Sequence, residues 1–274
     1  MSISRLKTAA IVALALINAF FLTVIIIDRA AVARSERQAI EDACAVLRAG
    51  GITIYPENIF PVGAIRTMRT AREAEAEAMI AQAVLESAEI TDQSVIYIYE
   101  NAQRGTAEFA SGGNFEIQLY EGVITNAGGT IRTVERLLEN MGIEISNLVY
   151  AGGQETESVT VVCAYKGASI FNCTIEFTFR GDSLETVKGR YVTGFEAIAG
   201  DTEISSVGTA LLGFLAEVRR GTLDCSRIDR IEAGYRHSVV GSFGEGSIDP
   251  VWLVITDSGR YIIDDATGAI APVA

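Results

Sequence analysis

The side chains that most often perform enzymatic chemistry are sparse in this sequence. His237 is the only histidine, and no G-x-S-x-G motif presents a serine, so a Ser-His-Asp or Cys-His arrangement has one imidazole to draw on. His237 follows the polar end of an expected strand, and we predict a surface or loop position for it. The residue types therefore do not favour nucleophilic catalysis.

Metal and cofactor motifs are equally scarce. A single histidine excludes multi-histidine zinc sites, and the four cysteines show no C-x-x-C spacing. The glycines within residues 241–246 lie between two expected strands and open no helix, unlike a phosphate-binding loop. Carboxylate pairs cannot be judged from spacing along the chain, which leaves a surface hydrolase open as one class. We expect no enzyme activity, no metal and no cofactor.

Two cysteines occupy matching places in an expected hairpin. Apolar residues alternate over 159–165 and again over 171–179, and a turn centred on Ala168 places Cys163 opposite Cys173. The pair would form a cross-strand disulfide or remain as buried thiols, which behave as small apolar groups. Both alternatives stay open, because an exterior location permits a disulfide without requiring one.

The N-terminal region contains a long apolar stretch. Residues 8–27 are 20 residues without a charge, glycine or proline, enough to cross roughly 30 Å of hydrocarbon as a helix. We expect a cytoplasmic tail at 1–7, a transmembrane helix at 8–27 and the remaining chain outside the cytoplasm at the cell membrane. The alternative is a cleaved signal peptide, for which residues 31–33 offer a small-x-small site.

Two polar side chains lie within this stretch. A polar group in hydrocarbon favours contact with a neighbouring helix, so Asn18 and Thr23 are candidate contacts with a partner helix. The alternative for Asn18 is an amide that the apolar segment tolerates.

The charge balance restricts the partners. The chain has 35 acidic against 22 basic residues and a net charge of −13. Such a surface is repelled by nucleic acid and by anionic lipid. We therefore expect no nucleic-acid partner.

Hydrophobic periodicity predicts an α+β fold, an N-terminal transmembrane helix followed by repeated helix-plus-antiparallel-meander units. The expected helices are 35–49, 66–87, 131–141 and 205–220, and the expected strands are 52–55, a meander over 94–123, 159–165, 171–179, 184–192, 228–236, 250–256 and 260–264. Thr130 is the expected N-cap of the third helix, with Ile131 facing inward. Two exterior subdomains, 28–125 and 126–274, would follow the tail and the transmembrane helix.

The last strands carry a distinctive motif. Residues 249–254 read Asp-Pro-Val-Trp-Leu-Val, and residues 259–270 run from Gly-Arg-Tyr to Ala-Thr-Gly-Ala-Ile. Trp252 and Tyr261 would pair across a hairpin, and Thr267-Gly268 would turn the chain out of the sheet. This motif resembles the end of the YycI/YycH-type accessory proteins of the cell-wall two-component system in Gram-positive bacteria, and more loosely PepSY-like domains.

The resemblance implies a non-catalytic function. A YycI/YycH-type protein would be a membrane-anchored regulator of a membrane sensor histidine kinase, with a related accessory protein as a second partner in a hetero-oligomer. The alternative is a PepSY-like module at the cell surface that binds a protein or inhibits a protease through its exterior surface alone.

Overall fold

The computed structural model describes residues 18, 20–23, 34, 37–60, 65–91, 96–153, 155–198, 204–239 and 245–273. A helical segment at residues 37–49 comes before the named elements. These are, in chain order, η1 (Pro56–Asn58), β1 (Ile59–Phe60), β2 (Met68–Thr70), α2 (Ala74–Leu85), β3 (Glu89–Thr91), β4 (Tyr97–Asn101), β5 (Gly105–Phe109), η2 (Ser111–Gly113), β6 (Asn114–Leu119), α3 (Thr130–Met141), β7 (Ile145–Gly152), β8 (Thr156–Tyr165), β9 (Ala168–Arg180), β10 (Ser183–Arg190), β11 (Glu196–Ala197), α4 (Val207–Arg220), β12 (Ile228–Val239), β13 (Gly246–Thr256), β14 (Arg260–Asp264) and β15 (Ile270–Pro272).

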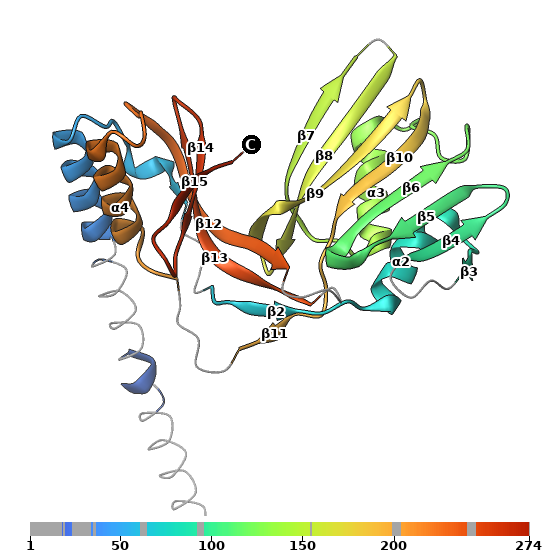
Figure 1. Cartoon of the computed structure of the whole chain (residues 1–274), viewed down its shortest axis with the longest axis horizontal. Coiled ribbons are helices and arrows are strands. Elements are labelled where there is room, and N and C mark those ends of the chain that lie inside the picture. The colour runs from blue at the N-terminus through green and yellow to red at the C-terminus, as the bar shows by residue number, and fades with distance from the viewer. Residues whose placement is uncertain are drawn as a thin grey trace, which may run out of the picture.

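The described strands form two groups that meet at one point (Figure 1). The first group runs from β7 through β8, β9, β10, β6, β5 and β4 to β3, and all its pairings are antiparallel. The second contains β1, β2 and β11 to β15. The groups join where β12 runs parallel to β9, with Tyr235 opposite Ile170. The first group therefore ends at two strands, β7 and β3.

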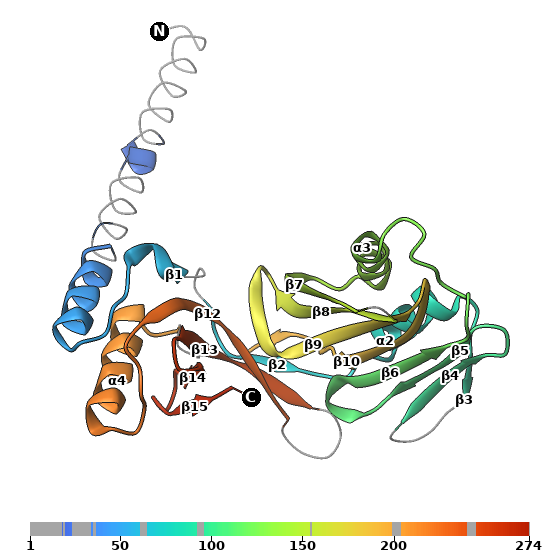
Figure 2. The same ribbon diagram turned by 90° about the horizontal axis from the view of Figure 1, so that it is seen from above.

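Helices α2 and α3 lie on the same face of the first group (Figure 2). The alternation of β8 and β9 explains this, because Val159, Val161, Ile175 and Phe177 all face this layer and are fully buried. The opposite face of these strands carries the polar residues between them. The expected alternation is confirmed over residues 159–163 and 173–179. Phe171 departs from it, because Ile170 takes the buried position and Phe171 packs against the separate cluster of Val251 and Leu253.

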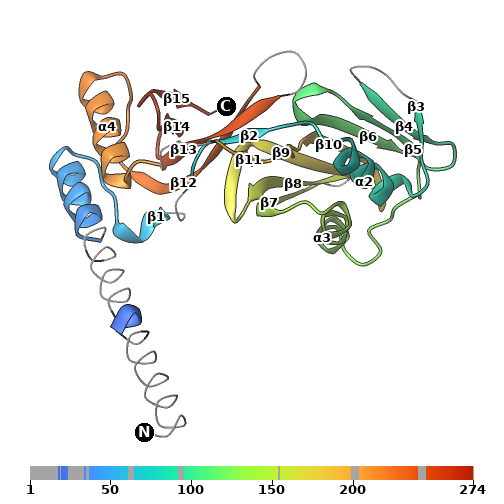
Figure 3. The ribbon, with the colours of Figure 1, turned by 90° about the horizontal axis from the view of Figure 1, so that it is seen from below.

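In the second group the helical segment 37–49 lies beside α4 (Figure 3). Leu47 and Leu215 are buried at this contact. The contact is close, because a Cβ atom added at Gly50 would lie 2.7 Å from the Leu215 side chain. Ser206 caps the start of helix α4 with a hydroxyl that accepts from the Thr209 amide, and Gly221 caps its end in the left-handed conformation. The helix expected at 205–220 is confirmed.

The expected fold class is wrong. The described residues are mostly sheet with few helices, and their fifteen strands are connected in one sheet, so the chain is not a repeat of helix-plus-meander units. The physical reason is the central strand β9, whose thirteen residues pair with β8, β10 and β12 and tie the two groups together. The division at residue 125 stays a prediction; β6 before it pairs with β10 after it.

The transmembrane expectation is also corrected. In the part of the chain that the structure describes, no helix is long and apolar enough to span a bilayer. The helix expected at residues 8–27 lies outside the described residues, apart from residues 18 and 20–23.

The expected helix at 66–87 is half wrong. Its first part is strand β2, which pairs with β13 and β11, and the helix begins only at Ala74. Glu77 of this helix is only 9% exposed, which is unusual for a carboxylate. The ion pair that it makes with Arg72 offsets the cost of burying the carboxylate.

Candidate functional site

The C-terminal motif forms the expected hairpin with a different register. Trp252 lies opposite Ile263, and Tyr261 lies opposite Val254, so the two aromatic residues are diagonal neighbours. Trp252 is buried, and the Tyr261 ring instead meets Phe214 edge to face at 5.8 Å between centroids. These aromatic side chains serve the core.

Thr267 and Gly268 do form a turn. The Thr267 hydroxyl and amide both donate to Asp264 Oδ1, at 2.8 and 3.0 Å, and Gly268 has a positive φ of 69°. The chain does not leave the sheet there, however, because β15 returns to pair with β14. This part of the prediction is corrected.

Cys163 and Cys173 are free, buried thiols. The hairpin turns at Lys166-Gly167, both with positive φ, and not around Ala168 as expected. A bulge between Val162 and Ala164 shifts the strand register between the body of the hairpin and this turn. Burial raises the pKa of Cys173 to about 12 and also raises the pKa of Cys163. Buried thiols with raised pKa values are poor nucleophiles.

His237 is not a surface or loop residue. It lies within β12, is 4% exposed, and its Nδ1 has no hydrogen-bond partner within the described residues. Asn172 clamps its backbone with two hydrogen bonds of 2.8 Å. Burial, and next the charge of Arg190, lower the pKa of His237, which keeps the ring neutral.

Asn18 and Thr23 are both helical and exposed. No partner chain is present to test their predicted helix contacts, which stay a prediction.

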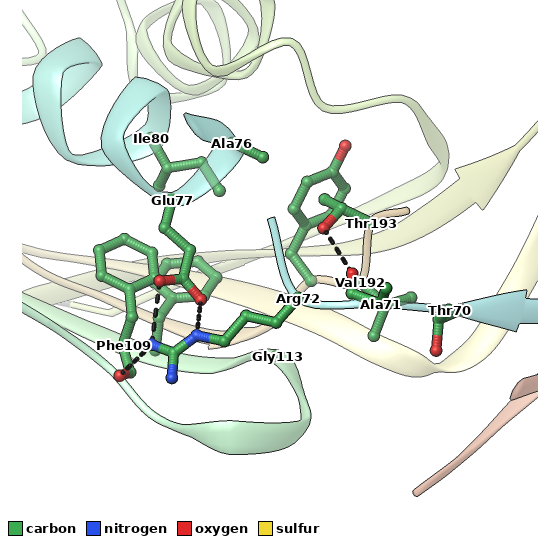
Figure 4. Close-up of a pocket in the computed structure, with 12 residues that line it drawn as sticks. Thr70, Ala71, Arg72, Ala76, Glu77, Ile80, Phe109, Gly113, Val192 and Thr193 are labelled. Atoms are coloured by element: carbon green, nitrogen blue, oxygen red, sulfur yellow. Dashed lines mark hydrogen bonds and ion pairs between the residues drawn. The ribbon is translucent and has the colours of Figure 1, made fainter. Parts of the chain in front are cut away.

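The junction between the two groups contains a small cavity (Figure 4). Arg72 there donates to both carboxylate oxygens of Glu77 at 2.7 and 3.0 Å and to the Phe109 carbonyl at 3.0 Å. Its guanidinium also lies 4.0 Å from the centre of the Tyr97 ring. The cavity measures about 30 Å³, space for about one water molecule. This cluster is a structural joint.

The feature most suited to binding is strand β7. Within the described residues β7 pairs only with β8, so its other edge carries backbone groups without a strand partner. Its eight residues, Ile145–Gly152, include no charged residue and no proline. Natural sheets protect such edges with charges, prolines, bulges or very short strands. The only irregularity in β7 lies between Ile145 and Asn147, which leaves 147–152 as an unprotected edge.

A groove lies between Tyr150 of β7, Glu157 of β8 and the start of α3. Its volume is about 440 Å³, and its lining residues are Gly128, Gly129, Thr130, Ile131, Arg132, Glu135, Tyr150 and Glu157. Tyr150 faces this groove because it lies opposite the buried Val159, whereas Val149 faces the other side of the sheet. Val149 is 56% exposed and Tyr150 45%, so apolar surface lines both sides of the free edge.

Glu157 is the fixed charge of the groove. The Thr130 hydroxyl donates to its carboxylate at the first turn of α3, and Tyr150 lines the groove together with the same side chain. The positive end of the helix dipole favours the carboxylate at this place. Desolvation, and next the neighbouring charge of Glu157, raise the pKa of Tyr150.

Sequence reasoning missed this site. Strand β7 was not predicted, although the run Leu148-Val149-Tyr150 of strand-forming residues before Gly152 would have indicated it. Thr130 was expected as N-cap and Ile131 as inward, but Gly129 holds the cap position and Ile131 is 42% exposed. The exposure of Ile131 points to a binding surface, but helix periodicity predicted that this residue is buried.

No protein-family model matches the chain, and no curated protein matches it. Among solved structures, an uncharacterized protein from Eubacterium rectale aligns with a TM-score of 0.47 and 9% identity over 81% of this chain and 93% of that chain. The C-terminal domain of Bacillus megaterium YpeB aligns with a TM-score of 0.34 and 11% identity over 75% of this chain and 99% of that chain. Both TM-scores lie below 0.5, so neither likeness carries an argument about the fold or the function of this chain.

Proposed function

We propose that the chain is a non-catalytic protein-binding module that acts outside the cytoplasm and binds its partner by adding a strand to β7. The observation that carries the proposal is the free, uncharged edge over residues 147–152, flanked by the exposed side chains of Val149 and Tyr150. Backbone hydrogen bonds to such an edge supply affinity, and alternate side chains of the added strand supply specificity. An edge left without the usual protection is ready to pair with a strand of another chain.

A second candidate names the partner. The motif at 249–270, which resembles the end of YycI/YycH-type proteins, favours a regulator of a membrane sensor histidine kinase in two-component signalling. Regulation of this kind requires that the bound module prefers one signalling state of the kinase, by about 1–3 kcal/mol for typical coupling. The PepSY-like alternative requires only that the bound segment belongs to another surface protein or a protease.

Crosslinking from successive positions of β7, which reports the register of a bound strand, tests the strand-addition proposal. A photoreactive residue is placed in turn at 147, 149 and 151, which share one face of β7, and the captured residues are mapped by mass spectrometry. Strand addition predicts capture of one partner segment, at positions that advance in steps of two residues. The control position is Leu212, an exposed residue of α4 on the other group of strands.

The outcomes separate the candidates. A single segment in register from a sensor kinase supports regulation of that kinase, and a single segment from another protein supports the PepSY-like alternative. Capture at scattered positions, or capture equal to that from Leu212, would contradict strand addition.

A further inference from the structure

The groove beside β7 restricts which strand it accepts. An added strand would point every second side chain towards α3, into the space lined by Tyr150, Ile131 and Glu157. We propose, on the basis of the strand-addition function, that the occupant is an extended segment of a partner protein that carries a lysine or arginine against Glu157, between apolar side chains.

The charges of the groove carry this inference. Two carboxylates, Glu135 and Glu157, line it against the single cation Arg132. None of the three makes an ion pair within the part of the chain that the structure describes. Arg132 and Glu135 are exposed, whereas the Thr130 hydroxyl holds Glu157 at the helix start. The fixed carboxylate therefore decides the charge of the bound side chain.

The same charges disfavour a second copy of this chain. Two copies paired through β7 would bring their acidic grooves together, and each copy has a net charge of −13. A basic strand from a different protein has the complementary charge and steers towards this edge faster at low salt. The apolar positions of the segment would contact Ile131 and Tyr150, which are 42% and 45% exposed.

A pair of matched peptides tests the inference. The probes are fluorescent nine-residue peptides of alternating threonine and valine, capped at both ends, with either lysine or glutamate at the centre. Binding to the full chain is measured by fluorescence anisotropy at low and at physiological salt. We expect the lysine peptide to bind about tenfold more tightly than the glutamate peptide, in line with a hydrogen-bonded ion pair.

Three variants assign the effect. Glu157→Gln keeps the acceptor for Thr130 and should bring the two peptides within about threefold of each other, by loss of the charge alone. Arg132→Gln should keep or increase the preference for lysine. Val149→Lys should weaken both peptides, because a lysine beside the edge opposes strand addition, and Leu212→Lys should weaken neither.

The failures are distinguishable. If both peptides bind equally and Val149→Lys abolishes this binding, the inference of a basic segment is overturned and the strand-addition function is still supported. Binding that Val149→Lys does not affect, or no binding of either peptide, would overturn both. A dimer in sedimentation that Val149→Lys converts to a monomer would make a second copy the occupant and would also overturn the inference.

Discussion

At the residue scale, several buried polar side chains have structural roles in the described part of the chain. Glu77 and Arg72 form an ion pair at the junction of the two strand groups. His237 packs closely beside Gly246, because a Cβ atom added at residue 246 would lie 2.8 Å from His237 Nε2. Within the described residues no group of three or more histidine, cysteine, aspartate or glutamate side chains is placed to hold a metal ion.

The ion pair at the junction should be costly to break. Glu77→Ala leaves the Arg72 guanidinium, 18% exposed, without its carboxylate partner, and should lower the free energy of unfolding by about 3 kcal/mol. Glu75→Ala, on the exposed side of the same helix, should change it by less than about 0.5 kcal/mol. Denaturant unfolding of both variants makes the comparison, and equal effects would remove the structural role of the pair.

His237 should make stability sensitive to acid. The pKa of His237 is lowered in the folded chain, so the unfolded chain binds a proton more readily, near pH 6.5. Above pH 6.5 the imidazole is neutral in both states and does not change the free energy of unfolding. As the pH falls from 6.5 towards the lower folded pKa, the unfolded chain takes up the proton and the free energy of unfolding decreases by up to about 1.4 kcal/mol per pH unit. His237→Gln lacks this titration, so its unfolding free energy should fall less between pH 7 and pH 5. Parallel curves for both proteins would refute the assignment.

At the scale of the elements, amphipathic packing accounts for the second group. Phe214 of α4 is fully buried and Leu212 of the same helix is 48% exposed. Phe214→Ala should therefore lower the free energy of unfolding by about 3–5 kcal/mol, and Leu212→Ala by less than about 0.5 kcal/mol. Thermal and denaturant unfolding of the two variants measure this difference. A similar loss in both would mean that α4 packs through another face.

The elements also show what a sequence pattern can predict. The alternation of β8 and β9 and the glycine ends of α3 and α4 were readable, because burial period and left-handed caps are local properties. The pairing of β2 with β13, the burial of Glu77 and the parallel contact of β12 with β9 were not, because they depend on residues distant in the chain. Strand β7 was missed since an edge exposed on both faces shows little alternation.

At the scale of the whole molecule, the connected sheet determines where a partner can bind. Of the two end strands of the first group, β3 has three residues and β7 has eight, so only β7 offers an edge long enough for several backbone hydrogen bonds. Helix α3 forms one wall beside that edge and supplies Thr130, which holds Glu157. The helices of the second group lie away from this edge (Figure 2).

Hydrogen exchange along β7 tests the central claim most directly. The full chain is compared with and without the central-lysine peptide at saturation, and exchange is followed by mass spectrometry over residues 145–152 and, as a control, over 89–91. Strand addition predicts slower exchange in β7, where outward amides gain hydrogen bonds, with no change in β3. Peptide that binds while β7 exchanges at its original rate would contradict the claim.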